Sequence, residues 1–370
     1  MRTHTFALSV VATGLFVGCS GNGSSHPMMG DDNGTGGGVD ASGGSGDGEL
    51  PFTRGVGTLA GTGNAGYVDG DRSIAQFSNP VNVAYHDGML YVADFGNNKL
   101  RVIDTRTHTT STVISQPGFT RPFGMTFTAD GTLYVSTDND QAGNHTPMSG
   151  SIWKVDIAAR TATVIANAIG RPRGLAALPD GRLAAADYLH DVIELVDVRT
   201  GQATTIAGAW DSRSMVDGPG TVARFSSPRS LAVRGDGTLL VADLGNNRIR
   251  LVGLDGMTST LSGVSQPGFV DDTLAAARFN QPQGLSIAAN GDVYITDLGN
   301  FRVRRIVGDR VETVAGNGTG GWVDSDDRLA SELYGLEGLS VVPDGSMVYV
   351  ADGNRGDAVS YNRVRQIKLN

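Results

Sequence analysis

A short segment that the chain repeats with variations sets the strongest limit on its fold. The clearest copy, LLVADLGNNRIRLVG at residues 239–253, begins with an apolar run that ends at Asp243. A Gly-Asn-Asn turn follows, and polar and apolar residues then alternate from Arg248. Since Gly and Asn tolerate positive φ, this pattern predicts a β-hairpin with one buried strand and one half-exposed strand.

The chain contains five further copies of this hairpin, which begin at Leu90, Leu133, Leu183, Val293 and Val348. The aspartates that end the first strand of the six copies are Asp94, Asp138, Asp187, Asp243, Asp297 and Asp352. Repeats of roughly 40 to 50 residues with four strands each are typical of propeller blades. We therefore predict an all-β fold, a six-bladed β-propeller.

The outer strands indicate how the ring closes. No outer-strand sequence follows the last third strand, at residues 362–369, whereas one stands at the front as GTLAG, residues 57–61. Without an additional strand, two sheet edges would stay unpaired. We expect this N-terminal strand to complete the sixth blade.

Residues 1–50 differ from the rest of the chain. Residues 1–18 have one Arg and then an apolar run, and they resemble a bacterial lipoprotein signal peptide. Cys19, the only cysteine of the chain, follows directly and is the residue that would be lipidated. Residues 19–50 are rich in Gly, Ser and Asp and are predicted to be a disordered tether. We expect residues 51–370 to form the propeller and to be a monomer. The lipid alone would hold it at the bacterial cell envelope, either in the periplasm or exposed at the surface. The alternative is secretion without a lipid.

The charge of the chain argues against one class of partner. Residues 1–50 carry one basic and five acidic side chains, so −5 of the formal net charge of −9 belongs to the remaining chain. Nucleic-acid binders are expected to present a basic face. We predict no nucleic-acid binding.

The repeat resembles a known family. The combination AGTG, GYVDG, AQF and LYVADFGNNKLRVI between residues 60 and 103 is similar to the NHL repeat, and the resemblance extends over residues 56–369. It implies a six-bladed propeller. It does not imply one function, because NHL proteins include protein and RNA binders, signalling ectodomains and some metal-dependent enzymes.

Polar residues of the repeated hairpin have simple structural interpretations. Each strand-ending Asp is expected to hydrogen-bond its own turn. Arginines of the third strands are expected to face solvent; they are Arg101, Arg248, Arg250, Arg302 and Arg304. His145 and His190, with Asp138 or Asp140, could form a metal site, although their spacing does not require one.

The connectors between blades differ in length. Those before blades 1, 4, 5 and 6 are long and share a Val-Asp motif that precedes Phe77, Phe225, Phe279 or Leu333. We interpret these connectors as packing a large side chain between blades; an aromatic rim for sugars or peptides is the alternative. The connectors into blades 2 and 3 are short, which should leave the face low there, beside an insertion at residues 140–150.

The inner strands predict which side chains surround the mouth of the central channel. The residues that follow the inner-strand prolines, or replace them in the last blade, are Val81, Phe123, Arg173, Arg229, Gln283 and Glu337. Two guanidinium and two apolar groups form a poor cage for a hard cation. We therefore favour a binding module without a cofactor or catalytic residues over the alternative, a metal-dependent propeller lyase or lactonase-like hydrolase.

The candidate binding site is cationic. Guanidinium groups bind carboxylate or phosphate in bidentate fashion and attract it over a distance. We expect a protein, peptide or glycan ligand with an anionic group to bind here, at residues Arg171, Arg173, Arg229, Gln283, Glu337 and His190. The alternative is a structural ion pair in which Arg173 or Arg229 contacts Glu337 across the channel.

Overall fold

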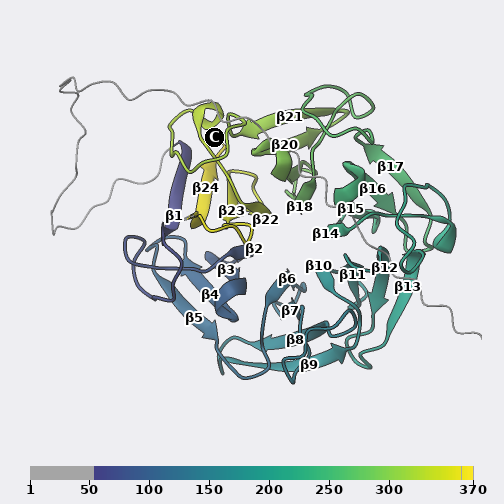
Figure 1. Cartoon of the computed structure of the whole chain (residues 1–370), viewed down its shortest axis with the longest axis horizontal. Helices are drawn as coiled ribbons and strands as arrows, with labels where there is room; N and C mark the ends of the chain where they lie inside the picture. Colours follow the sequence, from purple (N-terminus) through teal and green to yellow (C-terminus); the bar gives the residue numbers. More distant parts are fainter. Residues whose placement is uncertain (1–53, 360, 370) are drawn as a thin grey trace, which may run out of the picture. The chain divides into compact units, whose positions relative to one another are not determined.

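The computed structural model describes residues 54–359 and 361–369. They form six four-stranded antiparallel sheets arranged in a ring (Figure 1), so the predicted all-β, six-bladed β-propeller is confirmed. The described helices are short 3-10 turns: η1 (Phe95–Asn97), η2 (Gly220–Val222), η3 (Leu244–Asn246), η4 (Leu298–Asn300) and η5 (Arg328–Ala330). The predicted signal peptide, Cys19 and the tether lie outside the described residues.

Each blade is a meander that runs from an inner strand at the channel to an outer strand at the periphery. Blade 1 is β2 (Pro80–His86), β3 (Met89–Asp94), β4 (Lys99–Asp104) and β5 (Thr110–Ile114). Blade 2 is β6 (Pro122–Phe127), β7 (Leu133–Thr137), β8 (Ser151–Asp156) and β9 (Thr161–Asn167). Blade 3 is β10 (Pro172–Ala177), β11 (Leu183–Asp187), β12 (Val192–Val196) and β13 (Ala203–Gly208).

The second half of the ring repeats this order. Blade 4 is β14 (Pro228–Val233), β15 (Leu239–Asp243), β16 (Arg248–Val252) and β17 (Thr258–Ser262). Blade 5 is β18 (Pro282–Ile287), β19 (Val293–Asp297), β20 (Arg302–Val307) and β21 (Arg310–Ala315). Blade 6 is β22 (Leu336–Val341), β23 (Met347–Asp352), β24 (Asn362–Lys368) and, as its outer strand, β1 (Gly55–Gly63).

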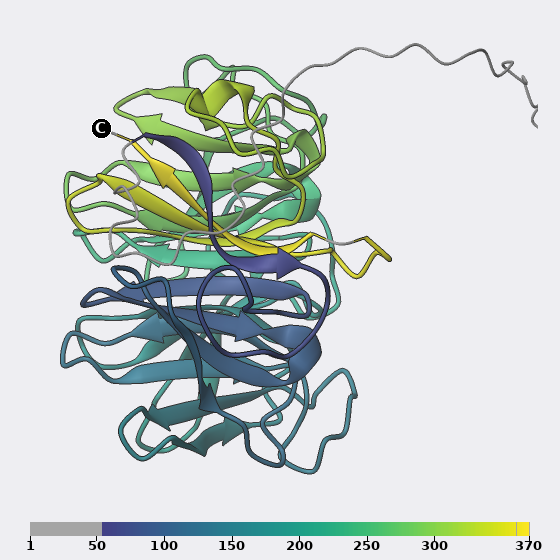
Figure 2. The ribbon, with the colours of Figure 1, turned by 90° about the vertical axis from the view of Figure 1, so that its left-hand side faces the viewer.

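The N-terminal strand closes the ring as predicted. Strand β1 pairs antiparallel with β24, with Val56 opposite Ile367 and Thr58 opposite Arg365. Figure 2 shows the purple β1 beside the yellow β24. The first and last described strands therefore share one sheet.

The core lies between the blades. The connector side chains Phe77, Phe225, Phe279 and Leu333 are fully buried, and each belongs to a cluster of core residues from two neighbouring blades, which confirms that they pack between blades. The aromatic residues that precede Val-Asp in the same connectors remain exposed, with Tyr67 at 47% and Trp322 at 50%. Each long connector thus contributes a buried side chain and, in three of four cases, an exposed ring.

The expectation that third-strand arginines face solvent is wrong for Arg101, Arg250 and Arg304, which are fully buried. Arg304 shows why: its Nη1 donates to Asp297 at 2.8 Å, and its Nε donates to the connector residue Asp271 at 3.0 Å. The other two arginines make the same pair of contacts. The connector covers the third strand, so the arginine of that strand is buried and joins the strand-ending aspartate to the connector aspartate.

The strand-ending aspartates consequently do more than bind their own turn. Asp94 accepts from Asn97 of the turn, from Arg101, and from the Ser78 N–H ahead of the inner strand. Burial raises the pKa of Asp94, Asp243 and Asp297 to about 6, while these hydrogen bonds and the arginines limit the rise. Each carboxylate joins three parts of its blade.

Blade 2 departs from the predicted alignment by one residue. Pro122 of its inner strand lies opposite Thr137, whereas the equivalent Pro80 and Pro172 lie opposite Asp94 and Asp187. Thr137 therefore occupies the strand-ending position, and Asp138 is the first residue of the following loop. Trp153 takes the place of the buried arginine and donates from its indole nitrogen to Thr137 at 2.9 Å.

Over the described part of the chain, no helix has the length and apolar character needed to cross a bilayer.

Candidate binding site at the channel mouth

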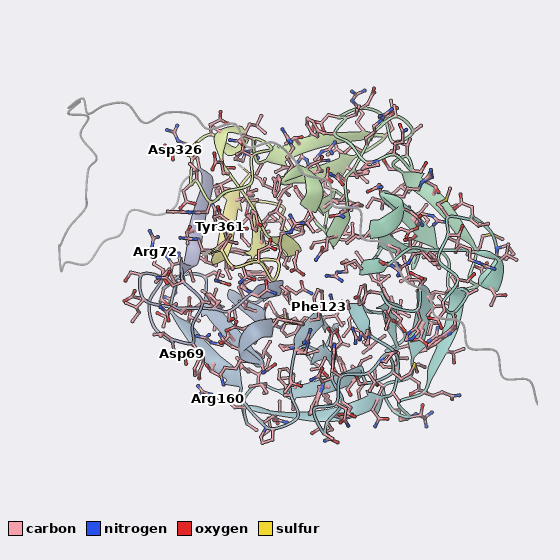
Figure 3. The ribbon with its side chains drawn as sticks, viewed as in Figure 1. Asp69, Arg72, Phe123, Arg160, Asp326 and Tyr361 are labelled. Carbon is pink, nitrogen blue, oxygen red and sulfur yellow. The ribbon has the colours of Figure 1, made fainter. Side chains whose placement is uncertain are left out.

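The central channel is a cavity of about 380 Å³ that is lined by all six inner strands. The six residues predicted to surround its mouth all line it: Val81, Phe123, Arg173, Arg229, Gln283 and Glu337. Figure 3 shows one of them, Phe123, beside the central opening, with Asp69 toward the periphery. The repeated inner-strand start thus places one side chain from each blade in one ring.

Arg173 is held by an acid of the neighbouring blade. Its Nη2 and Nε donate to the two carboxylate oxygens of Asp138, at 2.6 Å and 3.2 Å. Asp138 is almost fully buried in the loop that follows β7. The guanidinium of Arg173 also lies against the rings of Phe123 and Tyr188, 4.5 Å and 4.3 Å from their centroids. Arg173 is therefore fixed in position by both charge and stacking.

Arg229 lacks such a partner. Its side chain is only 14% exposed and lies 4.9 Å from the ring centroids of both Phe123 and Tyr188. Among the residues that the structure describes, its buried Nε has no hydrogen-bond partner, and its Nη2 forms an ion pair with the Glu337 carboxylate at 3.6 Å, longer than a hydrogen bond. Burial, and then the charge of Arg173, lower the pKa of Arg229 to about 10, so it remains a cation at neutral pH.

Glu337 and Gln283 form the opposite side of the ring. Gln283 Nε2 donates to Glu337 Oε2 at 2.8 Å, and both side chains are buried. Burial raises the pKa of Glu337, while Arg229 and Arg173 lower it. The alternative expected from the sequence, an ion pair with Glu337, is present for Arg229 at 3.6 Å, whereas Arg173 pairs with Asp138 instead.

A second group of cations lies next to Arg173. Arg121 approaches Asp138 to 3.9 Å, and the side chain of Arg171 has a buried Nε without a hydrogen-bond partner within the described residues. Burial, followed by the charges of Arg171 and Arg121, lowers the pKa of His145. The blade 2 loop and the start of blade 3 therefore add positive charge beside the mouth.

The structure does not bring His190 to the ring. Its Nδ1 lies 2.6 Å from Asp187 Oδ2, and its ring packs 4.6 Å from that of Trp210. This is the contact that Asn97 makes with Asp94 in blade 1, so His190 replaces a turn asparagine. His145 instead lies 2.7 Å from Asn139. Within residues 54–359 and 361–369, no three His, Cys, Asp or Glu side chains gather as metal ligands would.

The loops around the mouth follow the predicted arrangement in part. Long connectors and hairpin turns share one face, since Asn97 and Asn300 donate to the connector carbonyls of Gly66 and Gly268. The insertion packs closely against the short connector into blade 2. A Cβ at Gly118 of this connector would lie only 2.4 Å from the carbonyl oxygen of Gln141 in the insertion. The insertion therefore fills part of the sector expected to be low.

Sequence reasoning missed three residues of this site: Arg121, Asp138 in its actual role, and Tyr188. One feature of the sequence could have indicated Arg121. An Arg-Pro pair opens the inner strand in blades 2 and 3, at 121–122 and 171–172, and in no other blade. The pairing of Asp138 with Arg173 crosses between blades and left no such signal.

Comparisons with known proteins agree with this fold. The NHL repeat model matches residues 279–306. The chain is 25% identical over 292 residues to protein SUPPRESSOR OF QUENCHING 1, chloroplastic, of Arabidopsis thaliana, covering 67% of this chain and 27% of that protein. It is 25% identical over 316 residues to NHL repeat-containing protein 2 of Gallus gallus, covering 79% and 40%. The chain thus spans less than half the length of these relatives.

A solved structure shares the architecture. An auxiliary nutrient binding protein from Bacteroides thetaiotaomicron superposes with a TM-score of 0.67 at 18% identity, over 84% of this chain and 75% of that chain. Similarity at this level of identity shows the fold alone. The chain is therefore a six-bladed β-propeller that carries a match to the NHL repeat at residues 279–306.

Proposed function

We propose that this propeller is a binding module that holds an anionic group of a protein, peptide or glycan at the channel mouth. One observation carries the proposal: the guanidinium of Arg229 is nearly buried, yet its Nε has no hydrogen-bond partner among the described residues, and its ion pair with Glu337, at 3.6 Å, is longer than a hydrogen bond. A buried cation without hydrogen bonds is costly, and an incoming carboxylate or phosphate would satisfy it.

The surroundings of Arg229 suit such a ligand. Phe123 and Tyr188 contact the guanidinium through their rings, so its N–H groups are directed around its edge. Because this edge is planar, it can bind two oxygens of one anionic group. Gln283 and Glu337 lie beside Arg229, and their polar groups would contact hydroxyl or amide groups of the same ligand.

Residues outside the ring would assist approach. Arg171 and Arg121 add positive charge on the side of blades 2 and 3. Cationic groups beside an opening raise the rate at which anionic ligands arrive, and they do so more at low salt. These arginines therefore act as attracting groups, whereas Arg229 makes the contact.

The proposal includes display at a bacterial envelope through a lipid on Cys19. The signal-like segment and the Gly-rich tether support this placement. The Bacteroides propeller of the same fold is named an auxiliary nutrient binding protein, and a nutrient-capturing role would suit a tethered module.

The experiment that tests the proposal is a binding screen of the full chain against arrays of neutral and anionic oligosaccharides and peptides. Wild type is compared with Arg229→Ala and with Arg234→Ala, an exposed arginine at the far end of β14 that gives the same change in charge. We expect anionic ligands to bind wild type and the control but not Arg229→Ala. Equal binding by all three proteins, or a preference for neutral ligands, would contradict the proposal.

A further inference from the structure

The outer strands of five blades are capped by hydrogen bonds from elsewhere in the chain. In blade 1, Gly70 and Thr110 exchange backbone hydrogen bonds at 3.0 Å and 2.7 Å, and the Thr112 N–H donates to Asp69 at 3.1 Å. The equivalent contacts in blades 4, 5 and 6 use Asp217, Asp271 and Asp324. In blade 2, the Gln116 amide makes two hydrogen bonds to the backbone of Ala162, at 2.8 Å and 2.9 Å.

Blade 3 is the exception. By register, Ala203 and Thr205 of β13 correspond to Thr110 and Thr112 of β5. The connector into blade 3 is short, and within the described residues no group donates to or accepts from the outer backbone edge at these two positions. An uncapped outer strand is a template for pairing with another extended chain.

The aromatic position of the missing connector is filled from the opposite direction. In blade 1, Tyr67 of the preceding connector contacts the Thr112 hydroxyl at 3.0 Å. In blade 3, Trp210 of the following connector donates to the Thr205 hydroxyl at 3.0 Å. No segment among the described residues takes the place of the Val-Asp-Gly part of the connector, which in blade 1 pairs with the outer strand.

The charge at this edge is reversed relative to the other blades. Arg101 lies opposite Thr112 and binds Asp69 of the connector, whereas Glu194 lies opposite Thr205. Glu194 is 3% exposed, and its Oε2 has no hydrogen-bond partner among the described residues. The nearby Asp187 adds further negative charge. A strand that completes this edge would therefore need a cation where the connectors carry aspartate, and that cation would favour the ionised form of Glu194 over the protonated form that burial favours.

We propose that β13 is a docking edge for an extended basic peptide of a partner, which pairs antiparallel with Ala203 and Thr205 and directs a Lys or Arg toward Glu194. The chain's own N-terminal tail does not suit this edge, because residues 20–50 contain no Lys or Arg. A second copy paired through β13 would also lack one, since that strand reads ATTIAG. The site is separate from the channel mouth.

The test uses a peptide copied from the chain's own connector. The probe has the sequence of residues 65–70 with Tyr67→Ala, because Trp210 already occupies that position, and with Asp69→Lys. Its matched control keeps Asp69. Binding to the full chain is followed by the NMR shifts of the Ala203 and Thr205 amides, which report both affinity and location.

We expect the lysine probe to shift these amides and to bind about tenfold or more tightly than the aspartate control. Methylation of the Gly70 nitrogen in the probe should abolish binding, because the equivalent N–H donates to the strand in blade 1. Glu194→Gln should remove the preference for lysine. Four results would overturn the proposal: equal binding of the two peptides, binding that survives N-methylation, no shifts at saturating peptide, or pairing of two copies through β13. The comparison of the two peptides uses the wild-type protein, so it does not depend on whether a variant folds.

Discussion

Arg173 of blade 3 donates two hydrogen bonds to Asp138 of blade 2, so the two blades with short connectors are joined by an ion pair at the channel mouth. In four other blades, a buried arginine joins the strand-ending aspartate to the connector of its own blade. Blades 2 and 3 lack that arginine, with Trp153 and Glu194 in its place. Blades 2 and 3 thus have the Arg173–Asp138 ion pair between them, and each lacks the arginine–aspartate pair that the other four blades have within themselves.

Arg173→Ala should therefore destabilise the protein by about 3 kcal/mol, because the buried carboxylate of Asp138 loses its cation. Arg229→Ala should cost less, about 1 kcal/mol, because its ion pair with Glu337 is long, at 3.6 Å, and Glu337 keeps the hydrogen bond from Gln283. Chemical denaturation of both variants and wild type measures the difference. A larger loss for Arg229→Ala than for Arg173→Ala would show that these assignments are reversed.

The buried Glu194 should make stability depend on pH. Burial, and then the charge of Asp187, raise the pKa of Glu194 to about 7 from an ordinary value of 4.5. The folded protein thus keeps a proton that the unfolded chain releases, and the free energy of unfolding falls as pH rises through this window.

Glu194→Gln should remove this contribution. Relative to wild type, the variant should gain on the order of 3 kcal/mol of stability between pH 4.5 and pH 7, with no further gain above it. The difference between the two proteins is the quantity to measure, because Asp94, Asp243 and Asp297 also have raised pKa values and affect both equally. A difference that is independent of pH would mean that Glu194 is ionised in the folded protein throughout.

Removal of the closing strand should be severely destabilising. Val56 and Leu59 of β1 are buried, and losing their two side chains alone costs about 3 to 6 kcal/mol. Deleting residues 52–61 should also uncover β24 and promote aggregation. Deletion of residues 20–46 is the control and should leave Tm unchanged. Similar melting of the two deletion variants would refute the role of β1 in stability.

Anchoring depends on the only cysteine. Cys19→Ser should move the protein from the membrane fraction of its host to the soluble fraction, or leave the signal segment uncleaved. Fractionation and labelling with a fatty-acid probe check this. Labelling of the serine variant would show that the lipid, if any, is attached elsewhere.

The fold was predictable because its information is local and repeated. Each hairpin carries its own turn residues, and Asn98 and Asn247 have φ of 55°, as the turn pattern requires. The ring at the channel mouth was predictable for the same reason, since the inner-strand start fixes one position in every blade. The outer strand at the front of the sequence was recognisable because the last blade lacked one.

The contacts between segments distant in sequence were not predictable. Arg101 and Arg304 alternate with apolar residues as solvent-facing residues do, and only the folded connector shows that they are buried. Asp138 was misassigned because the strand end and the next residue, Thr137 and Asp138, are both good turn formers. His190 was placed at the site from its loop, but the acceptor that fixes it, Asp187, is three residues away.

The most direct test of the account is the affinity of the Arg229 variants for an anionic ligand identified by the array screen, measured by calorimetry at low and high salt. We predict that wild-type affinity falls with salt and that Arg229→Ala weakens it by about tenfold or more, whereas Arg229→Lys loses less and Arg234→Ala nothing. Affinity that is insensitive to salt and unchanged in Arg229→Ala would contradict the assignment of the channel mouth as the binding site.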